Sequence, residues 1–127
     1  MRVLQAFVLG SVFGGMVSIG VVTAAEPETD PVKLSPQLYE VRFENDRLRV
    51  LEYRAKPGQK EPMHSHPSGV VYLFSDSVMR TTLPNGATSE APRKAGELYW
   101  RDFTTHAAEN IGETESHALA VELKPCH

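Results

Sequence analysis

Apolar and polar side chains alternate along two neighbouring stretches near the start of the folded part of the chain. Residues 39–44 (YEVRFE) alternate apolar and charged side chains, and residues 47–55 (RLRVLEYRA) continue in the same way. Successive side chains of a strand point to opposite faces, so a period of two is typical of strands with one buried face. The pattern predicts two strands joined by a turn at 44–46.

Further short apolar stretches follow at regular intervals. A continuous apolar run at 70–74 (VVYLF) predicts a buried strand, and 96–100 (GELYW) predicts another. Residues 117–123 (HALAVEL) alternate, with the larger apolar residues Leu119, Val121 and Leu123 sharing one face. The pair Asn85-Gly86 is a strong hairpin signal. No convincing helical period follows the N-terminal region, so the pattern predicts an all-β, antiparallel sandwich or barrel.

The first 25 residues have a different character. Arg2 precedes an uncharged apolar stretch at 3–22, and Ala24 and Ala25 provide small residues before a cleavage point. This layout predicts a secretory signal peptide at 1–25, and a periplasmic or secreted protein without membrane association after cleavage. The stretch is also long enough to cross a bilayer once, so a retained anchor is the alternative. A flexible lead-in is expected at 26–37 and the barrel at 38–125.

Size, charge and cysteine content narrow the classes of protein. The chain has 127 residues, of which 41% are apolar, which allows one domain. The formal net charge is −3 and no run of Lys or Arg stands out, so nucleic acid is not an expected partner. The single cysteine, Cys126, has no partner for an internal disulfide.

Three histidines are the candidate chemical site. His64 and His66 lie two residues apart, and in an extended segment their rings point to one side. His106 follows after a length of chain that an antiparallel barrel can return beside the first pair. Three neutral imidazoles suit borderline divalent ions such as Zn, Fe, Ni, Cu or Mn, and they leave coordination positions open for water or substrate. The alternative is that the histidines are solvated polar groups of a metal-free barrel.

The spacing of these residues resembles the two motifs of the cupin superfamily. Gly58 is followed by five residues and then by HSH, and HAAEN places His106 and Asn110 at the spacing of the second motif, which opens at Gly96. The resemblance spans 58–110. It implies a small, single-domain jelly-roll barrel preceded by the signal segment, with one divalent metal (Fe, Zn, Ni or Mn) held inside by His64, His66 and His106.

The chain departs from the cupin motifs in a way that bears on chemistry. The glutamate ligand of the first motif would fall at Val70 or Val71, so the expected site has three neutral histidines. The closing glycine of that motif and the Pro-x-Gly of the second are also missing. A metal without a bound carboxylate keeps more positive charge, which strengthens its hold on anionic ligands. Three-histidine iron sites are known among cupin-type dioxygenases acting on thiols and diketones.

Three carboxylates that are near the histidines in sequence could replace the missing glutamate ligand. They are interpreted as solvated surface groups: Glu61, Glu97 and Asp102.

Several other side chains have two readings. Asn110 is expected either to orient a metal ligand or to stabilise a turn. One of Tyr99 and Trp100 is expected to face the pocket, although core packing is the favoured role for either, and Tyr72 is expected in the core or behind the ligands. His117 is interpreted as a polar group at a strand start and not as a fourth ligand.

The resemblance implies an exported cupin that binds one divalent metal and acts on or binds a small oxygenated molecule. The enzyme reading is a metal-dependent dioxygenase, isomerase or lyase whose catalytic residues beyond the ligands the sequence leaves unidentified. The alternative is a non-enzymatic module for a small ligand or the metal. A homodimer formed through strands near Val41 and Val50 is a further possibility.

Overall fold

The computed structural model describes Gly20 and residues 24–126, so most of the expected signal segment lies outside the described residues. One short helix, α1 (Pro31–Leu34), precedes the strands. The strands are β1 (Tyr39–Glu44), β2 (Leu48–Ala55), β3 (Lys60–His66), β4 (Gly69–Leu73), β5 (Ser77–Thr82), β6 (Thr88–Arg93), β7 (Leu98–Arg101), β8 (Thr104–Asn110) and β9 (Ser116–Leu123). The predicted all-β fold is confirmed. Among the described residues, no helix has the length and apolar content needed to cross a membrane.

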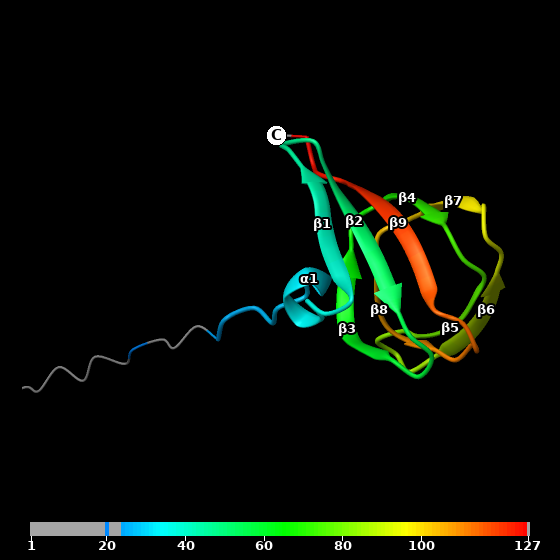
Figure 1. Cartoon of the computed structure of the whole chain (residues 1–127). Helices are drawn as coiled ribbons and strands as arrows, with labels where there is room; N and C mark the ends of the chain where they lie inside the picture. The colour runs from blue at the N-terminus through cyan, green and yellow to red at the C-terminus, as the bar shows by residue number, and fades with distance from the viewer. Residues whose placement is uncertain (1–19, 21–23, 127) are drawn as a thin grey trace, which may run out of the picture.

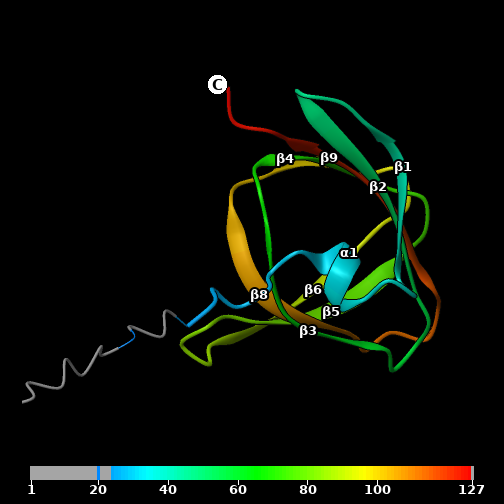
Figure 2. The same ribbon diagram turned by 90° about the vertical axis from the view of Figure 1, so that its left-hand side faces the viewer.

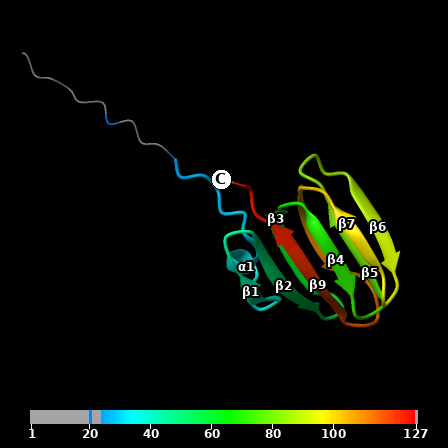
Figure 3. The ribbon, with the colours of Figure 1, turned by 90° about the horizontal axis from the view of Figure 1, so that it is seen from above.

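The strands form two antiparallel sheets that face each other. The larger sheet has the order β1-β2-β9-β4-β7, and the smaller has the order β3-β8-β5-β6. Figure 1 and Figure 3 show the two sheets curving around a common interior. Strands that are neighbours in the chain, such as β3 and β4, lie in different sheets, so the chain crosses between the layers as in a jelly roll. The predicted jelly-roll barrel is confirmed.

Two turns follow directly from the sequence pattern. Asn45 closes the β1–β2 turn, because its side-chain oxygen accepts hydrogen bonds from the backbone N–H groups of Arg47 (2.8 Å) and Leu48 (2.9 Å). At the β5–β6 hairpin, Gly86 has a φ of 84°, a conformation that glycine adopts without steric cost. The predicted hairpin at Asn85-Gly86 is confirmed.

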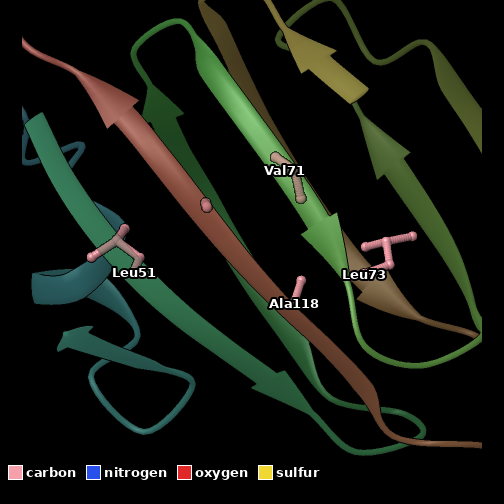
Figure 4. Packing of buried hydrophobic residues seen from close by; sticks show 5 residues of the cluster. Leu51, Val71, Leu73 and Ala118 are labelled. Carbon is pink, nitrogen blue, oxygen red and sulfur yellow. The ribbon is translucent and has the colours of Figure 1, made fainter. Parts of the chain in front are cut away.

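The strand β9 turns small side chains toward the interior of the barrel. The core cluster consists of Leu51, Val71, Leu73, Ala118 and Ala120, shown from close by in Figure 4. The strand β9 therefore turns Ala118, Ala120 and Glu122 inward, whereas Leu119, Val121 and Leu123 share the less buried outer face. Alanines leave room in the interior, and Glu122 is buried because partners neutralise its charge, as described below.

The strand β4 is also only half buried. Val71 and Leu73 point into the barrel, whereas Tyr72 is 39% exposed. The expectation that Tyr72 lies in the core or behind the ligands is therefore wrong. A continuous apolar run does not reveal that alternate residues of the strand face solvent on the outer side of the sheet.

The segment before β1 belongs to the folded body. Asp30 caps α1 by accepting a hydrogen bond from the N–H of Val32, and Val32 packs against the core cluster. The carbonyl of Thr29 accepts a hydrogen bond of 2.8 Å from the N–H of Ser65, next to the two histidines of β3. Figure 2 shows α1 at one end of the barrel, in front of the ring of strands. The part of the expected lead-in from Thr29 onward is thus held against the barrel.

Candidate metal centre

The pairing of β3 with β8 brings the three histidines together. His64 lies directly opposite His106 in this antiparallel pair, and His66 is two residues further along β3. The register shifts between Glu61 and His64. This irregularity places Glu61 on the buried face with His64 and His66, although residues three apart in a regular strand point to opposite faces.

The three imidazoles form a tight cluster. One ring nitrogen from each of His64, His66 and His106 lies within 4.8 Å of the other two, and His64 and His66 are almost fully buried. The Nε2 atoms of His64 and His66 are 2.9 Å apart. The structure therefore brings together all three residues that the sequence singled out.

The hydrogen bonds of the other ring nitrogens determine what these Nε2 atoms can do. Nδ1 of His64 donates to the carbonyl oxygen of Pro62 at 2.7 Å, and Nδ1 of His66 donates to the carboxylate of Glu122 at 2.6 Å. Both acceptors lack hydrogens, so each Nδ1 carries the proton and each neutral ring presents a lone pair at Nε2. Two lone pairs 2.9 Å apart repel each other unless a cation lies against them. The donor set therefore fits a metal ion.

A proton on His66 or on His106 is a poor substitute for that metal near neutral pH. Burial, opposed by the hydrogen bond to Glu122, lowers the pKa of His66 to about 4. Burial, together with the neighbouring His64 and His66, lowers the pKa of His106 to about 3. Both rings are neutral at physiological pH, which is the state in which imidazole coordinates a metal.

Glu122 is a further residue of the candidate site that the sequence analysis did not identify. Its carboxylate is 1% exposed and accepts hydrogen bonds from His66, from Arg49 (2.9 Å) and from Arg101 (3.2 Å). Burial raises the pKa of this carboxyl, but the hydrogen bonds from His66 and Arg49 outweigh burial and lower it. A carboxylate that holds Nδ1–H of a ligand histidine fixes the ring and raises its basicity. The signal in the sequence was a glutamate at an alternate position of an otherwise apolar strand.

Glu61 corrects another expectation. It was interpreted as a solvated surface group, but it is 5% exposed and lies on the inner face of β3. Its Oε1 accepts a hydrogen bond of 2.6 Å from the hydroxyl of Tyr39 and lies 3.6 Å from Nε2 of His64. Burial and the Glu61 carboxylate raise the pKa of Tyr39, which keeps its proton and remains a donor. The register shift in β3, which is invisible in the sequence, brings this carboxylate to the site.

The other two candidate carboxylates lie at the surface. Oε1 of Glu97 accepts a hydrogen bond from the backbone of Lys94, and Asp102 accepts one from the indole of Trp100. Neither belongs to the histidine cluster. For these two residues the interpretation as surface groups agrees with the structure.

A cavity of about 170 Å³ lies beside the histidines. His66, His106 and Glu61 line one part of it, and Tyr39, Tyr53, Arg93 and Arg101 add further polar groups. The remaining wall is mainly apolar and includes Val71, Leu73, Met79, Ala118 and Ala120. Val71 occupies one of the two positions at which the motif glutamate would fall, so the wall is apolar there. Of the two candidate aromatics, Tyr99 lines the cavity and Trp100 is 54% exposed.

Asn110 and His117 have structural partners away from the cluster. The side-chain amide of Asn110 donates to the carbonyls of Ala55 and Thr114, and its oxygen accepts from the N–H of Gly112. Of the two roles considered for Asn110, the structure thus shows the one in a turn. Nε2 of His117 lies 2.7 Å from Glu52, outside the cluster.

Comparison with known proteins gives a result at the level of the fold. No protein-family model and no curated protein sequence matches the chain. A cupin domain from Bordetella pertussis Tohama I matches with a TM-score of 0.64 and 22% identity, over 80% of this chain and 100% of that chain. A cupin family protein with a double-stranded β-helix fold from Methanocaldococcus jannaschii matches with a TM-score of 0.54 and 15% identity, over 68% of this chain and 78% of that chain.

A third match is a protein with a double-stranded β-helix domain from Klebsiella pneumoniae, with a TM-score of 0.52 and 22% identity over 68% of this chain and 75% of that chain. These matches agree with the two facing antiparallel sheets. The chain therefore has the cupin fold, and three of its own histidines lie close together inside the barrel.

Proposed function

We propose that this protein binds one divalent transition metal through His64, His66 and His106 and uses it to bind and transform a small oxygenated molecule. The observation that carries the proposal is the pair of Nε2 atoms 2.9 Å apart, each on a ring whose Nδ1 already donates a hydrogen bond. When bound, such a metal acts as a Lewis acid or as an oxygen-activating centre. Three protein ligands leave room on it for a substrate that enters from the cavity.

The same distance favours some metals over others. With metal–nitrogen bonds of about 2.1 Å, ligands at a right angle are about 3.0 Å apart and tetrahedral ligands about 3.4 Å apart. The separation of 2.9 Å between Nε2 of His64 and Nε2 of His66 suits the right angle. This pair of nitrogens thus suits iron, manganese or nickel, which accept octahedral surroundings, and zinc is the alternative because the donor of His106 is placed only within 4.8 Å of the other two.

Glu61 favours an enzyme over a metal-storage module. An enzyme of this kind needs a positioned polar group beside the reacting centre. Glu61 lines the cavity, is held by the Tyr39 hydroxyl at 2.6 Å, and lies 3.6 Å from a metal-facing histidine nitrogen. In the proposed role its carboxylate orients a bound molecule by accepting a hydrogen bond, while the apolar wall excludes water. A binding module without turnover remains the second candidate, because the same geometry also serves to hold a ligand.

Protein purified without added metal is expected to contain about one equivalent of a first-row transition metal per chain by elemental analysis. Small oxygenated acids and ketones should then be screened for turnover under air and under nitrogen. Product that forms only in air indicates a dioxygenase, and product that forms in both gases indicates an isomerase or lyase. Binding without product supports the module. A protein that takes up no transition metal, even after incubation with iron, manganese and nickel, contradicts the proposal.

The proposal includes export, and the fold is compatible with removal of the expected signal. Cleavage before Glu26 leaves Thr29, Asp30 and α1 attached, and all three contact the barrel or the segment packed on it. Mass spectrometry of the native protein is expected to show a chain that starts near Glu26. An intact Met1 in the membrane fraction would contradict cleavage and support the retained anchor.

A further inference from the structure

Arg101 has an unusual environment. It lies at the end of β7 and lines the same cavity as His66 and His106. Within the part of the chain that the structure describes, its Nε is the one buried side-chain nitrogen or oxygen without a hydrogen-bond partner. A buried N–H that lacks an acceptor is costly, and because Arg101 also lines the cavity, its guanidinium is a donor group that the acceptors of the described residues do not fully use.

The charges around Arg101 indicate the kind of acceptor. Arg101 and Arg49 both contact Glu122, and Arg49 also contacts Asp30. The two arginines and the two carboxylates of this group balance each other. A divalent metal on neutral histidines, opposed by the single carboxylate of Glu61, then leaves an excess of positive charge in the cavity. An anionic ligand removes that excess.

Arg93 adds a second guanidinium to the cavity wall. It lies over the ring of Tyr99, 4.3 Å from the ring centroid, and its Nη1 is 3.5 Å from the carboxylate of Glu97. Stacking on Tyr99 limits the freedom of this side chain, so its charge acts in a defined place. Guanidinium groups recognise carboxylates well because their N–H donors form a fixed planar fork.

The cavity also limits the size of the ligand. Its volume of about 170 Å³ is close to that of a protein cavity known to hold one benzene molecule, which is about 150 Å³. Sugars and peptides of several residues are larger than this. The part of a ligand that this cavity encloses is therefore of the size of a short-chain organic acid.

We propose that Arg101, supported by Arg93, forms a subsite for the carboxylate of a small organic acid whose other oxygen faces the histidine cluster. The proposal rests on the proposed metal function for the second contact, but the carboxylate contact itself belongs to this chain's own side chains. Arg101 thereby selects acids over neutral alcohols, amides and ketones of the same shape.

The test compares lactate with its neutral analogue lactamide by isothermal titration calorimetry, on metal-loaded and on metal-free protein. Lactate is expected to bind metal-loaded wild-type protein at least 10-fold more tightly than lactamide. In Arg101→Gln, lactate affinity is expected to fall about 10–100-fold, the usual effect of losing a hydrogen bond to a charged group. Arg80→Gln is the matched control, because Arg80 pairs with Glu90 and Glu109 away from the cavity. This variant should bind lactate as tightly as the wild type does.

Elemental analysis of each variant separates this proposal from the metal function. If the wild type and Arg101→Gln both hold metal and bind lactate equally well, the carboxylate subsite is wrong and the metal function stands. If no metal binds but lactate still binds in an Arg101-dependent way, the subsite stands and the metal function is wrong. Should Arg101→Gln fail to fold, Arg101→Lys keeps a positive charge beside Glu122 without the Nε donor. Lactate affinity equal to wild type in that variant overturns the proposal.

Discussion

Substitution of His66 by alanine is expected to abolish stoichiometric metal binding. His66 supplies one of the three histidine nitrogens of the cluster, and its loss leaves His64 and His106 as a two-ligand site. A metal that binds only the folded protein stabilises it by about 2.7 kcal/mol when its concentration is 100 times the dissociation constant. In a domain of this size that corresponds to a rise in melting temperature of roughly 10–20 °C on addition of metal. We expect the wild type to show this rise and His66→Ala to show almost none.

The measurement is the shift in melting temperature caused by the metal, combined with elemental analysis. Using the shift separates metal binding from the destabilisation that His66→Ala causes by leaving the Glu122 carboxylate without one of its donors. His117→Ala is the control, because His117 contacts Glu52 outside the cluster. This variant should keep the full metal-induced shift in melting temperature. Full metal occupancy in His66→Ala would show that the histidines do not form the metal site.

The metal-free protein is expected to lose stability steeply as the pH falls from about 6.5 toward 5. In the unfolded chain a histidine has a pKa of about 6.5. Burial lowers the pKa of His66 to about 4 and that of His106 to about 3 in the folded protein. Between these values the unfolded chain binds more protons than the folded one, so the free energy of unfolding decreases as the pH falls. Two histidines together contribute a slope of up to about 2.7 kcal/mol per pH unit.

Urea denaturation at several pH values between 7 and 5 measures this slope, and the range stays above that in which carboxyl groups titrate. His106→Gln should show about half the slope, because glutamine stays neutral at every pH. His117→Ala should keep the wild-type slope. A free energy of unfolding that is equal at pH 7 and pH 5 would contradict the prediction and would mean that the buried rings do not stay neutral in the folded protein.

The strands were more predictable than the direction in which their side chains point. The alternation in 39–44 and 47–55 and the turn signal at Asn85-Gly86 depend on local backbone preferences, which the sequence expresses directly. The alternation in 117–123 did not reveal which face of β9 points inward. The barrel places small residues around a cavity and a carboxylate behind His66, and the larger apolar residues lie on the outer face.

The histidine cluster was predictable for a similar reason. His64 and His66 share a face because side chains two apart in a strand point the same way, and the motif spacing indicated His106. The polar groups that complete the site were not predictable. Glu61 reaches it through a register shift in β3, and Arg101 and Glu122 come from strands of the other sheet. Nothing in the linear order of the chain connects these three residues.

The sequence alone determined an all-β fold, the places of two of its hairpin turns and three histidines able to serve as metal ligands. These features depend on interactions between residues close together in the chain, or on a spacing that a strand converts directly into geometry. Tertiary structure alone decided the tautomers of His64 and His66, the burial of Glu61 and Glu122, and the cavity with the unpaired Nε of Arg101. These depend on contacts between distant strands, where burial and neighbouring charges set the protonation and the partners of each group.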